Sequence, residues 1–359
     1  MTTRRSFLTT LLAASAMPTL SWADAGNPRY LAAAREPDGG YALFGLNALG
    51  QDTFRVPLPA RGHAAAGHPH KPLAVAFARR PGTYALVIDC ADGHVLHQLT
   101  LPERRRFNGH GAFSAGGDVL YTSEIDAASG QGVIGVWDAM SGYRRTGEWS
   151  SQGIGPHEIA RLPGSGDLVV ANGGIRTAMD DERSKLNLDT MAPNLSYFSA
   201  DGELLDQISL PPELHQNSIR HLALRSDGLV SFAMQTEDPD GWFTPLLGLH
   251  RRGAPLVLAA ATEPQQMRMK GYAGSIAFSG NGAQVALTSP HGGVLSLFDA
   301  AGQFQGMMAR TDVSGVGPAE GGFMTTDGLG GLCSIAGDAL SPLNSAPRAW
   351  DNHLVTLPV

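Results

Sequence analysis

Three histidines stand in similar short contexts far apart in the chain. They occur in the segments NGHGAFS, GIGPHEIA and SIRHLAL, as His110, His157 and His221. Each is followed by an alternating apolar run, a turn containing Gly and Asp, and a second apolar run. Neutral imidazoles are good ligands for iron, copper and zinc. If the fold brings the three segments together, they can supply a transition-metal site.

Further polar residues stand at matching offsets after these histidines. Glu124, Asn172 and Gln235 lie at or next to the end of the second apolar run. We predict that all three bind ligand beside the histidines, and Glu124 could form an acid–base pair with His157. The neighbours Glu158 and Arg220 are predicted to point away from the site and to brace adjacent repeats.

A second group of histidines lies in the segment RGHAAAGHPHKP, which we expect to be a loop. It contains His63, His68 and His70. We predict His63 as a fourth metal ligand, with His70 as the alternative. Other histidines are expected in outer strands or turns and are assigned no role: His94, His97, His215, His250 and His353.

The histidine segments belong to a repeated unit built from strands. Residues alternate with period two and are interrupted by Gly, Asp and Asn, and the unit recurs every 36 to 64 residues, roughly the spacing of propeller blades. The aligned units place the equivalents of the three histidines at Leu31, Ala74, Ser275 and Gly321. A second hairpin follows in several units, with Trp137 and Phe298 in equivalent places. Seven units of four antiparallel strands predict an all-β, seven-bladed β-propeller. We expect the N- and C-terminal strands to pair and close one blade, which removes exposed sheet edges.

A propeller would explain why the histidines recur. The first strand of each blade lines the central channel, so three consecutive blades would direct imidazoles toward the channel mouth. Descent from one ancestral repeat is the alternative explanation. In that case each histidine only hydrogen-bonds a neighbouring blade or a channel water.

Composition limits the classes of partner. The chain has 359 residues with 45 Gly and 23 Pro, only 16% charged residues and a formal net charge of −7. A weakly acidic chain is a poor partner for nucleic acid. No segment after the N-terminal region is long and apolar enough to cross a membrane. We expect a monomer, with Cys90 and Cys333 as buried free thiols.

The N-terminus has the pattern of an export signal. The segment RRSFL begins at Arg4, and a mildly apolar run follows it. This resembles a twin-arginine signal, which exports folded proteins to the periplasm. We predict that residues 1–25 are the signal and that residues 26–359 form a single propeller domain.

Several motifs resemble one family of exported bacterial proteins. The segments RGH, FARRPG, NGHGAFS, IGVWDA, GIGPHEIA, VVANGGI and SIRHLA are similar to the family called domain of unknown function 1513 (DUF1513), over nearly the whole chain after the signal. The resemblance implies a propeller related to WD repeats and lactonases. It also implies a setting in periplasmic iron acquisition, beside imelysin-like proteins and a dihaem oxidoreductase.

Two functions remain open at this point. We favour a non-catalytic binding propeller whose histidine-rich channel mouth holds a metal ion (Fe, Cu or Zn) or an iron-handling partner. The alternative is an enzyme at the same site, either a lactonase-like hydrolase or a metal-dependent oxidoreductase.

Overall fold

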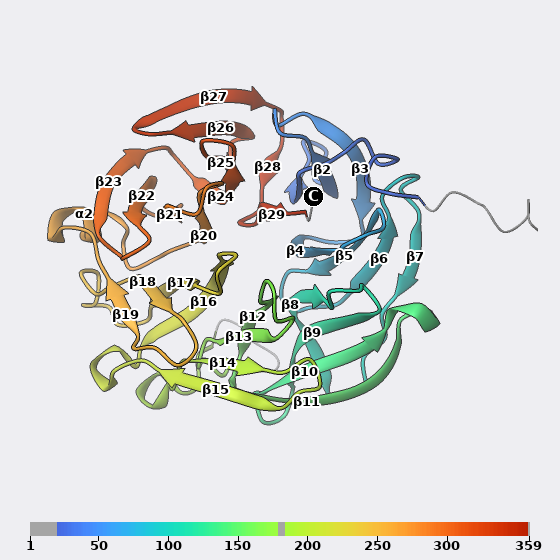
Figure 1. The fold of residues 1–359 in the computed structure, drawn as a ribbon, viewed down its shortest axis with the longest axis horizontal. Coiled ribbons are helices and arrows are strands. Elements are labelled where there is room, and N and C mark those ends of the chain that lie inside the picture. Colours follow the sequence, from blue (N-terminus) through green and yellow to red (C-terminus); the bar gives the residue numbers. More distant parts are fainter. Residues whose placement is uncertain (1–19, 179–183, 358–359) are drawn as a thin grey trace, which may run out of the picture.

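The chain forms a closed ring of seven antiparallel sheets (Figure 1). The computed structural model describes residues 20–178 and 184–357. Arg4 and the core of the predicted signal lie outside the described residues. Within these ranges, no helix is both long and apolar enough to span a membrane.

The seven blades follow one another along the chain, and each runs from the channel outward. Blade 1 contains β1 (Tyr30–Arg35), β2 (Tyr41–Leu46), β3 (Asp52–Leu58), β28 (Ala349–Trp350) and β29 (Val355–Thr356). Blade 2 contains β4 (Gly62–Gly67), β5 (Leu73–Ala78), β6 (Ala85–Asp89) and β7 (Val95–Gln98). Blade 3 contains β8 (Arg105–Phe113), β9 (Val119–Asp126), β10 (Gln131–Asp138) and β11 (Arg144–Ile154). Blade 4 contains β12 (Pro156–Arg161), β13 (Leu168–Asn172), β14 (Asn194–Phe198) and β15 (Leu204–Ser209).

The remaining three blades have the same order of strands. Blade 5 contains β16 (Asn217–Leu224), β17 (Val230–Thr236), β18 (Leu247–His250) and β19 (Val257–Ala259). Blade 6 contains β20 (Ser275–Phe278), β21 (Gln284–Ser289), β22 (Val294–Asp299) and β23 (Phe304–Ala309). Blade 7 contains β24 (Val313–Ala319), β25 (Gly322–Asp327), β26 (Gly331–Ala336) and β27 (Ala339–Ser345). The short helices among residues 20–178 and 184–357 are α2 (Glu263–Arg268), η1 (Ala139–Ser141), η2 (Leu188–Thr190) and η3 (Pro212–Leu214).

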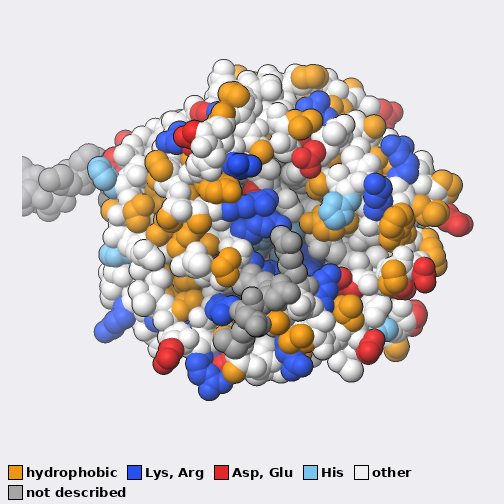
Figure 2. Space-filling view, turned by 180° about the vertical axis from the view of Figure 1, so that it is seen from behind, with side chains coloured by type: hydrophobic (Ala, Val, Ile, Leu, Met, Phe, Trp, Pro, Cys, Tyr) orange, Lys and Arg blue, Asp and Glu red, His pale blue; other side chains and the backbone are white. Residues whose placement is uncertain are grey.

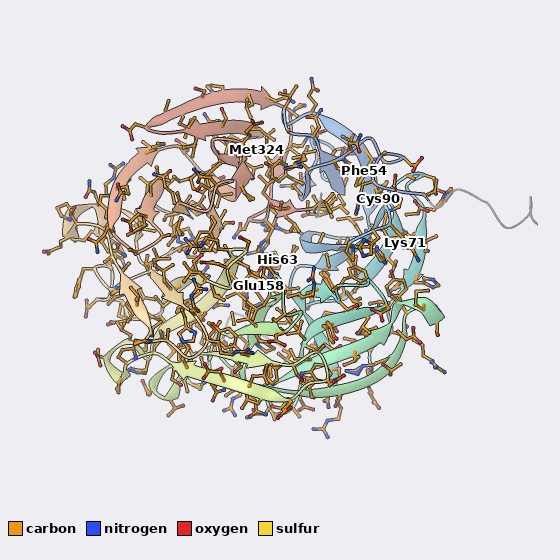
Figure 3. The ribbon with its side chains drawn as sticks, viewed as in Figure 1. Phe54, His63, Lys71, Cys90, Glu158 and Met324 are labelled. Carbon is orange, nitrogen blue, oxygen red and sulfur yellow. The ribbon has the colours of Figure 1, made fainter. Side chains whose placement is uncertain are left out.

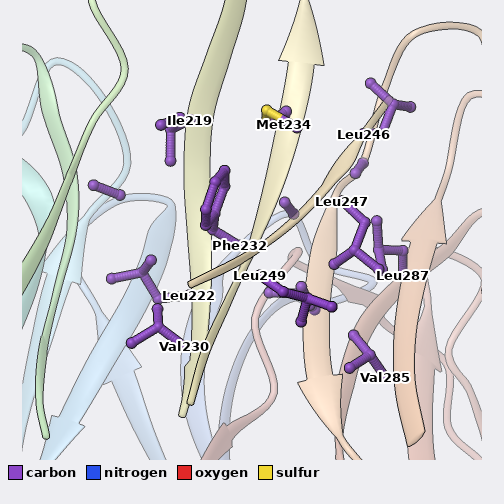
Figure 4. Close-up of a cluster of buried hydrophobic side chains, with 14 of the residues drawn as sticks. Ile219, Leu222, Val230, Phe232, Met234, Leu246, Leu247, Leu249, Val285 and Leu287 are labelled. Carbon is purple, nitrogen blue, oxygen red and sulfur yellow. The ribbon is translucent and has the colours of Figure 1, made fainter. Parts of the chain in front are cut away.

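Burial falls from the middle of each blade to its outer edge. The second strands are almost entirely buried, as in β5 and β13, whereas β7 is exposed along its whole length. Both faces of a middle strand are covered by neighbouring blades, so its sequence is a continuous apolar run. Figure 4 shows one of these interblade cores, where Phe232 and Leu249 of blade 5 pack near Leu287 of blade 6.

The two ends of the chain close the ring, as the sequence predicted. In blade 1, β1 pairs with β28 through Ala34 and Trp350, and with β29 through Tyr30 and Thr356. The C-terminal segment therefore supplies the innermost part of the blade, and the N-terminal segment supplies the outer three strands. This arrangement leaves no open edge between the first and last blades.

The predicted blade alignment was wrong by one strand in three blades. Leu31 and Ala74 lie in β1 and β5, which are second strands, and Gly321 lies in the turn before β25. The segment predicted as a loop around His63 is instead β4, the innermost strand of blade 2. The apolar periodicity of first and second strands is similar, so it did not distinguish them.

The two cysteines are buried free thiols, as predicted. Burial raises the pKa of both thiols, and this makes the reactive thiolate form unfavourable.

Candidate metal centre

The innermost strands lose regular pairing at their histidines. The ladder between β8 and β9 shifts register between Phe107 and Gly111, on either side of His110. The ladder between β16 and β17 shifts between Ile219 and Leu222, around His221. Equivalent shifts surround His63 in β4 and His157 in β12. A bulge redirects a side chain that would otherwise follow the pleat, and here it accompanies imidazoles that meet in the channel.

Five imidazoles meet near the axis of the propeller, at the position where Figure 3 labels His63. Their ring centroids lie 4.4 to 5.9 Å from their neighbours in the group. All five side chains are buried, with exposed fractions between 3% and 8%. We call this group the imidazole cluster; it consists of His63, His110, His157, His221 and His353.

A glycine permits the close approach of two of these rings. Gly109 precedes His110 and has a φ of +96°, a left-handed backbone conformation that side chains disfavour. A Cβ atom at this position would lie 2.5 Å from the ring of His63. The glycine before the histidine in NGHGAFS is therefore required by the packing of the cluster.

Several ring nitrogens in the cluster have no hydrogen-bond partner among the described residues. They are His63 Nδ1, His110 Nε2 and His157 Nε2. His353 Nε2 lies 3.3 Å from His63 Nε2, so only one ring of that pair can donate. A buried polar atom without a partner costs about 1–3 kcal/mol. Each neutral ring carries one lone pair on one of its two nitrogens, and a metal ion bound among the rings would accept such lone pairs.

The cluster keeps its imidazoles neutral at physiological pH. Burial lowers the pKa of His63 to about 4 and that of His221 to about 3. Burial, together with the neighbouring histidines, also holds the pKa values of His110, His157 and His353 well below the usual value. Neutral imidazole is the form that binds metal, so these rings do not need to lose a proton first.

Two carboxylates contact the cluster from opposite blades. Glu158 Oε2 lies 3.3 Å from His221 Nδ1 and 4.0 Å from His110 Nδ1, and it accepts a hydrogen bond from the backbone N–H of Leu222. Asp351 Oδ1 lies 3.6 Å from His63 Nδ1. A carboxylate behind a ligating histidine fixes its ring orientation and raises its basicity. Glu158 does brace the adjacent blade, as predicted, but it also faces the channel, which the sequence alternation did not predict.

The two carboxylates have opposite pKa shifts. Burial raises the pKa of Glu158 to about 8, and the Leu222 N–H opposes this only in part. Burial also opposes ionisation of Asp351, but its contacts with His63, Arg79 and Arg61 outweigh that effect and hold its pKa below the usual range. Asp351 is therefore the ionised partner of the cluster at neutral pH.

The cluster contains two sets of three nitrogens close enough to hold a metal ion. One set is His63, His110 and His157, and the other is His110, His221 and His353. Within each set the ligand atoms lie within 4.8 Å of one another. Three to five nitrogen donors without a thiolate suit zinc, copper(II) or iron(II).

The imidazole cluster lies inside the channel and not at its mouth. A cavity of about 870 Å³ opens on one side and is lined by His63, His157 and His221. Cavities of about 800 and 400 Å³ open on the other side and are lined by Glu158 and His353. The first cavity is the central hollow in Figure 2, which Lys and Arg side chains border.

Two of the predicted ligand-binding residues are committed to hydrogen bonds with other groups of the protein. Glu124 is fully buried in blade 3, where Arg145 and Thr122 hold its carboxylate at 2.6 Å. Asn172 is fully buried in blade 4 and hydrogen-bonds Ser151 and the side chain of Asn194. Neither lines the three channel cavities, so the structure does not bring Glu124 together with His157 as an acid–base pair.

The third predicted ligand-binding residue does reach the channel. Gln235 lines the 870 Å³ cavity, and its side-chain amide donates to the carbonyl of Ala273. Lys185, in the segment between β13 and β14 of blade 4, lines the same cavity.

The prediction from sequence did not include His353, which belongs to the cluster, and it offered His70, which lies outside the cluster, as an alternative ligand. His353 lies between β28 and β29, on the closing segment that forms the inner part of blade 1. The signal that could have found it is the predicted closure itself, because the C-terminal strand must then line the channel like other first strands. His70, the alternative fourth ligand, is exposed and contacts the carbonyl of Ala115. His68 packs on Phe113.

These observations define the class of protein: a seven-bladed β-propeller whose channel is crossed by a cluster of buried neutral imidazoles. The chain belongs to the family described as "Protein of unknown function (DUF1513)", which matches residues 56–357. No curated protein matches the sequence.

Solved structures of similar fold are distant in sequence. A chain of Kuenenia stuttgartiensis hydrazine synthase is 11% identical with a TM-score of 0.59, over 86% of this chain and 90% of that one. The Dos1 propeller is 12% identical with a TM-score of 0.57, over 90% of this chain and 85% of that one. The β-propeller domain of Cps50 (Swd1) from Myceliophteria thermophila is 16% identical with a TM-score of 0.53, over 76% and 80% of the two chains. At these identities the likeness concerns the fold alone.

Proposed function

We propose that this protein binds a transition-metal ion in its central channel and acts as a metal-binding propeller without catalysis. The observation that carries the proposal is the imidazole cluster, in which five buried neutral rings meet and three ring nitrogens lack hydrogen-bond partners among the described residues. Each ring comes from a different blade, so the closed ring of blades fixes the donor positions before the metal arrives. Such preorganisation lowers the entropic cost of binding.

The proposal extends to iron handling in the periplasm. The twin-arginine pattern at Arg4 supports export of a folded chain, which would allow a metal to be loaded before export. The family resemblance supports a role beside imelysin-like proteins and a dihaem oxidoreductase. All-nitrogen donors with flanking carboxylates accept iron, and they also accept copper and zinc, so the metal is to be identified by experiment.

Metal titration tests the binding proposal. Chelator-treated protein is titrated separately with Fe²⁺ under anaerobic conditions, Cu²⁺ and Zn²⁺, and metal content is measured after gel filtration. We expect about one equivalent of at least one metal to remain bound and to raise the melting temperature, because the ligand binds only the folded state. Retention of none of the three metals would contradict the proposal.

Cell fractionation tests the export proposal. The full chain is compared with the variant Arg4→Lys/Arg5→Lys, which keeps the positive charge of the N-terminal region. We expect the unaltered chain in the periplasmic fraction and the variant in the cytoplasmic fraction. Equal distribution of the two chains would contradict export by the twin-arginine route.

A further inference from the structure

The two ends of the channel differ sharply in charge. The 870 Å³ cavity is lined by basic side chains that include Arg61, Arg79, Lys185, Arg220 and Lys270. At the opposite end, the 800 Å³ cavity is lined by Arg225, Asp227 and Glu158, in which acidic and basic groups are mixed. Figure 2 shows the basic side chains gathered around the central hollow. We call the 870 Å³ space the basic cavity.

Two described acidic side chains lie against these cations. Asp351 pairs with Arg61 at 2.6 Å and with Arg79 at 3.2 Å. Glu237 pairs with Lys185 and lies 3.9 Å from Arg220. Among the described residues, these two carboxylates contact four of the five cations, so positive groups outnumber negative ones around this recess with low-dielectric walls. Such a recess concentrates anions.

Among these cations, Arg220 gives the strongest indication that the cavity binds an anion. Its side chain is about nine-tenths buried, and its Nε atom has no hydrogen-bond partner among the described residues. Its other contacts are long, at 3.5 Å to His157 Nδ1 and 3.9 Å to Glu237. A guanidinium has five N–H donors in a rigid fork, and a buried one needs acceptors. A carboxylate or phosphate group in the cavity would supply them.

The rim of the cavity also holds Lys270 in an unfavourable backbone conformation. Lys270 has a φ of +52° and is followed by Gly271 at +64°. The left-handed region costs a residue other than glycine about 1–2 kcal/mol. Such strain is concentrated at ligand sites, and Lys270 lines the cavity.

We propose that the basic cavity binds a small oxyanion with two or more negative charges, carried on carboxylate or phosphate groups, with Arg220 as its buried anchor. The volume is in the range of small-molecule sites. Arginine recognises both kinds of group through paired N–H···O bonds. The site adjoins the imidazole cluster through His63, His157 and His221, so a bound oxyanion would lie next to a metal held there. Anion binding itself does not depend on the metal.

Calorimetric titration tests this proposal on the whole chain. Chelator-treated protein is titrated with citrate in one arm and with inorganic phosphate in the other, at low and at high salt. We expect binding of at least one anion and a clear loss of affinity at high salt, because the attraction is electrostatic. The two arms distinguish a carboxylate ligand from a phosphate ligand, and binding of neither would overturn the proposal.

Two variants and a matched control locate the site. Arg220→Gln should weaken anion binding by at least about tenfold, as expected when a charge-assisted hydrogen bond is removed. If this variant does not fold, Lys270→Gln provides the test at an exposed position. Arg225→Gln removes an arginine at the opposite end of the channel and should bind like the unaltered chain. Equal affinity in the two cavity variants and the unaltered chain, or equal loss in the control, would overturn the assignment. Metal content of the same samples shows separately whether the imidazole cluster is functional.

Discussion

Two buried polar clusters in this propeller differ in how completely the protein satisfies them. One network joins Ser151 of blade 3 to Asn172, Asn194 and Ser196 of blade 4 through hydrogen bonds among these side chains and the backbone. Asn172 and Asn194 each use both the oxygen and the nitrogen of the side-chain amide in hydrogen bonds. In the channel, by contrast, the imidazole cluster contains three ring nitrogens without partners among the described residues.

The difference indicates different roles. A fully satisfied network stabilises the fold and needs no further component. A cluster of neutral bases with unused lone pairs is costly to bury, and an ion that accepts those lone pairs removes the cost. The network around Asn172 therefore stabilises the fold, whereas the imidazole cluster contains donor groups that could hold a metal ion.

The comparison extends to the blades that contribute no imidazole. In blade 6 the inner strand carries Ser275, whose hydroxyl accepts from the N–H of Val316 in blade 7. Thr288 donates to the carbonyl of Ser314 across the same interface. The repeat therefore does not require histidine at this depth of the channel.

Removing two imidazoles should have the largest effect on metal binding. The variant His110→Ala/His157→Ala leaves the second set of ligands incomplete as well, because His110 belongs to both. We expect retained metal to fall from about one equivalent to nearly none, measured by elemental analysis after gel filtration. The control His70→Ala/His94→Ala removes two exposed histidines and should retain metal like the unaltered chain. If His110→Ala/His157→Ala keeps its metal, the imidazole cluster is not the metal site, and the proposed difference between the two polar clusters is wrong.

Acid should destabilise the metal-free protein through the cluster. The folded-state pKa values of the five histidines lie far below the value of about 6.5 expected in the unfolded chain. Below pH 6.5 the unfolded chain therefore binds more protons, and stability falls as the pH drops from about 6.5 to 4. Glu158 acts in the opposite direction, because its raised pKa adds stability as the pH falls from about 8 to 4.5. Asp351, with its lowered pKa, affects stability only below about pH 4.

The size of the acid effect can be bounded. The unfolded chain binds up to five more protons on the histidines, and the folded chain binds one more on Glu158. The net difference of up to four protons changes the free energy of unfolding by about 5 kcal/mol per pH unit at most. Urea unfolding midpoints measured at several pH values between 4 and 7.5 provide the slope. The variant His110→Ala/His157→Ala should show a slope smaller by about two protons. Identical slopes would mean that these histidines are not buried in their neutral form.

Breaking the satisfied network should affect stability and not metal. Asn172→Ala leaves the hydroxyl and carbonyl of Ser151 and the side chain of Asn194 without this partner. We expect a loss of about 3 kcal/mol in the free energy of unfolding, measured in urea. Metal content should stay at that of the unaltered chain. A loss of metal in folded Asn172→Ala would contradict the conclusion that this network acts only on stability.

Changing the carboxylate behind the imidazoles should have the smallest effect. Glu158→Gln keeps an oxygen that can accept from the Leu222 N–H, but it removes the acid group next to His221. Partners of ligating histidines contribute about 10- to 100-fold in metal affinity. Competition with a chromogenic chelator measures the change. An affinity equal to that of the unaltered chain would show that Glu158 only braces the adjacent blade.

The sequence was sufficient for the fold and for part of the site. Period-two alternation and repeated turns predicted seven blades and their closure, because strand pairing depends on these local patterns. His110, His157 and His221 were found because they stand in similar contexts. His353 was missed because its context, AWDNHL, does not resemble the others, and only ring closure brings it to the channel. Gln235 lines the channel cavity and Asn172 does not, because their side chains point in different directions at the ends of their strands. Periodicity does not determine this direction.

Anomalous diffraction from crystals of the metal-loaded protein tests the central claim most directly. Data are collected at the absorption edge of the metal that titration identifies. The account predicts one dominant peak inside the channel, about 2.0–2.1 Å from nitrogen atoms of the imidazole cluster. An empty channel with the metal bound only at surface histidines such as His70 or His94 would contradict it.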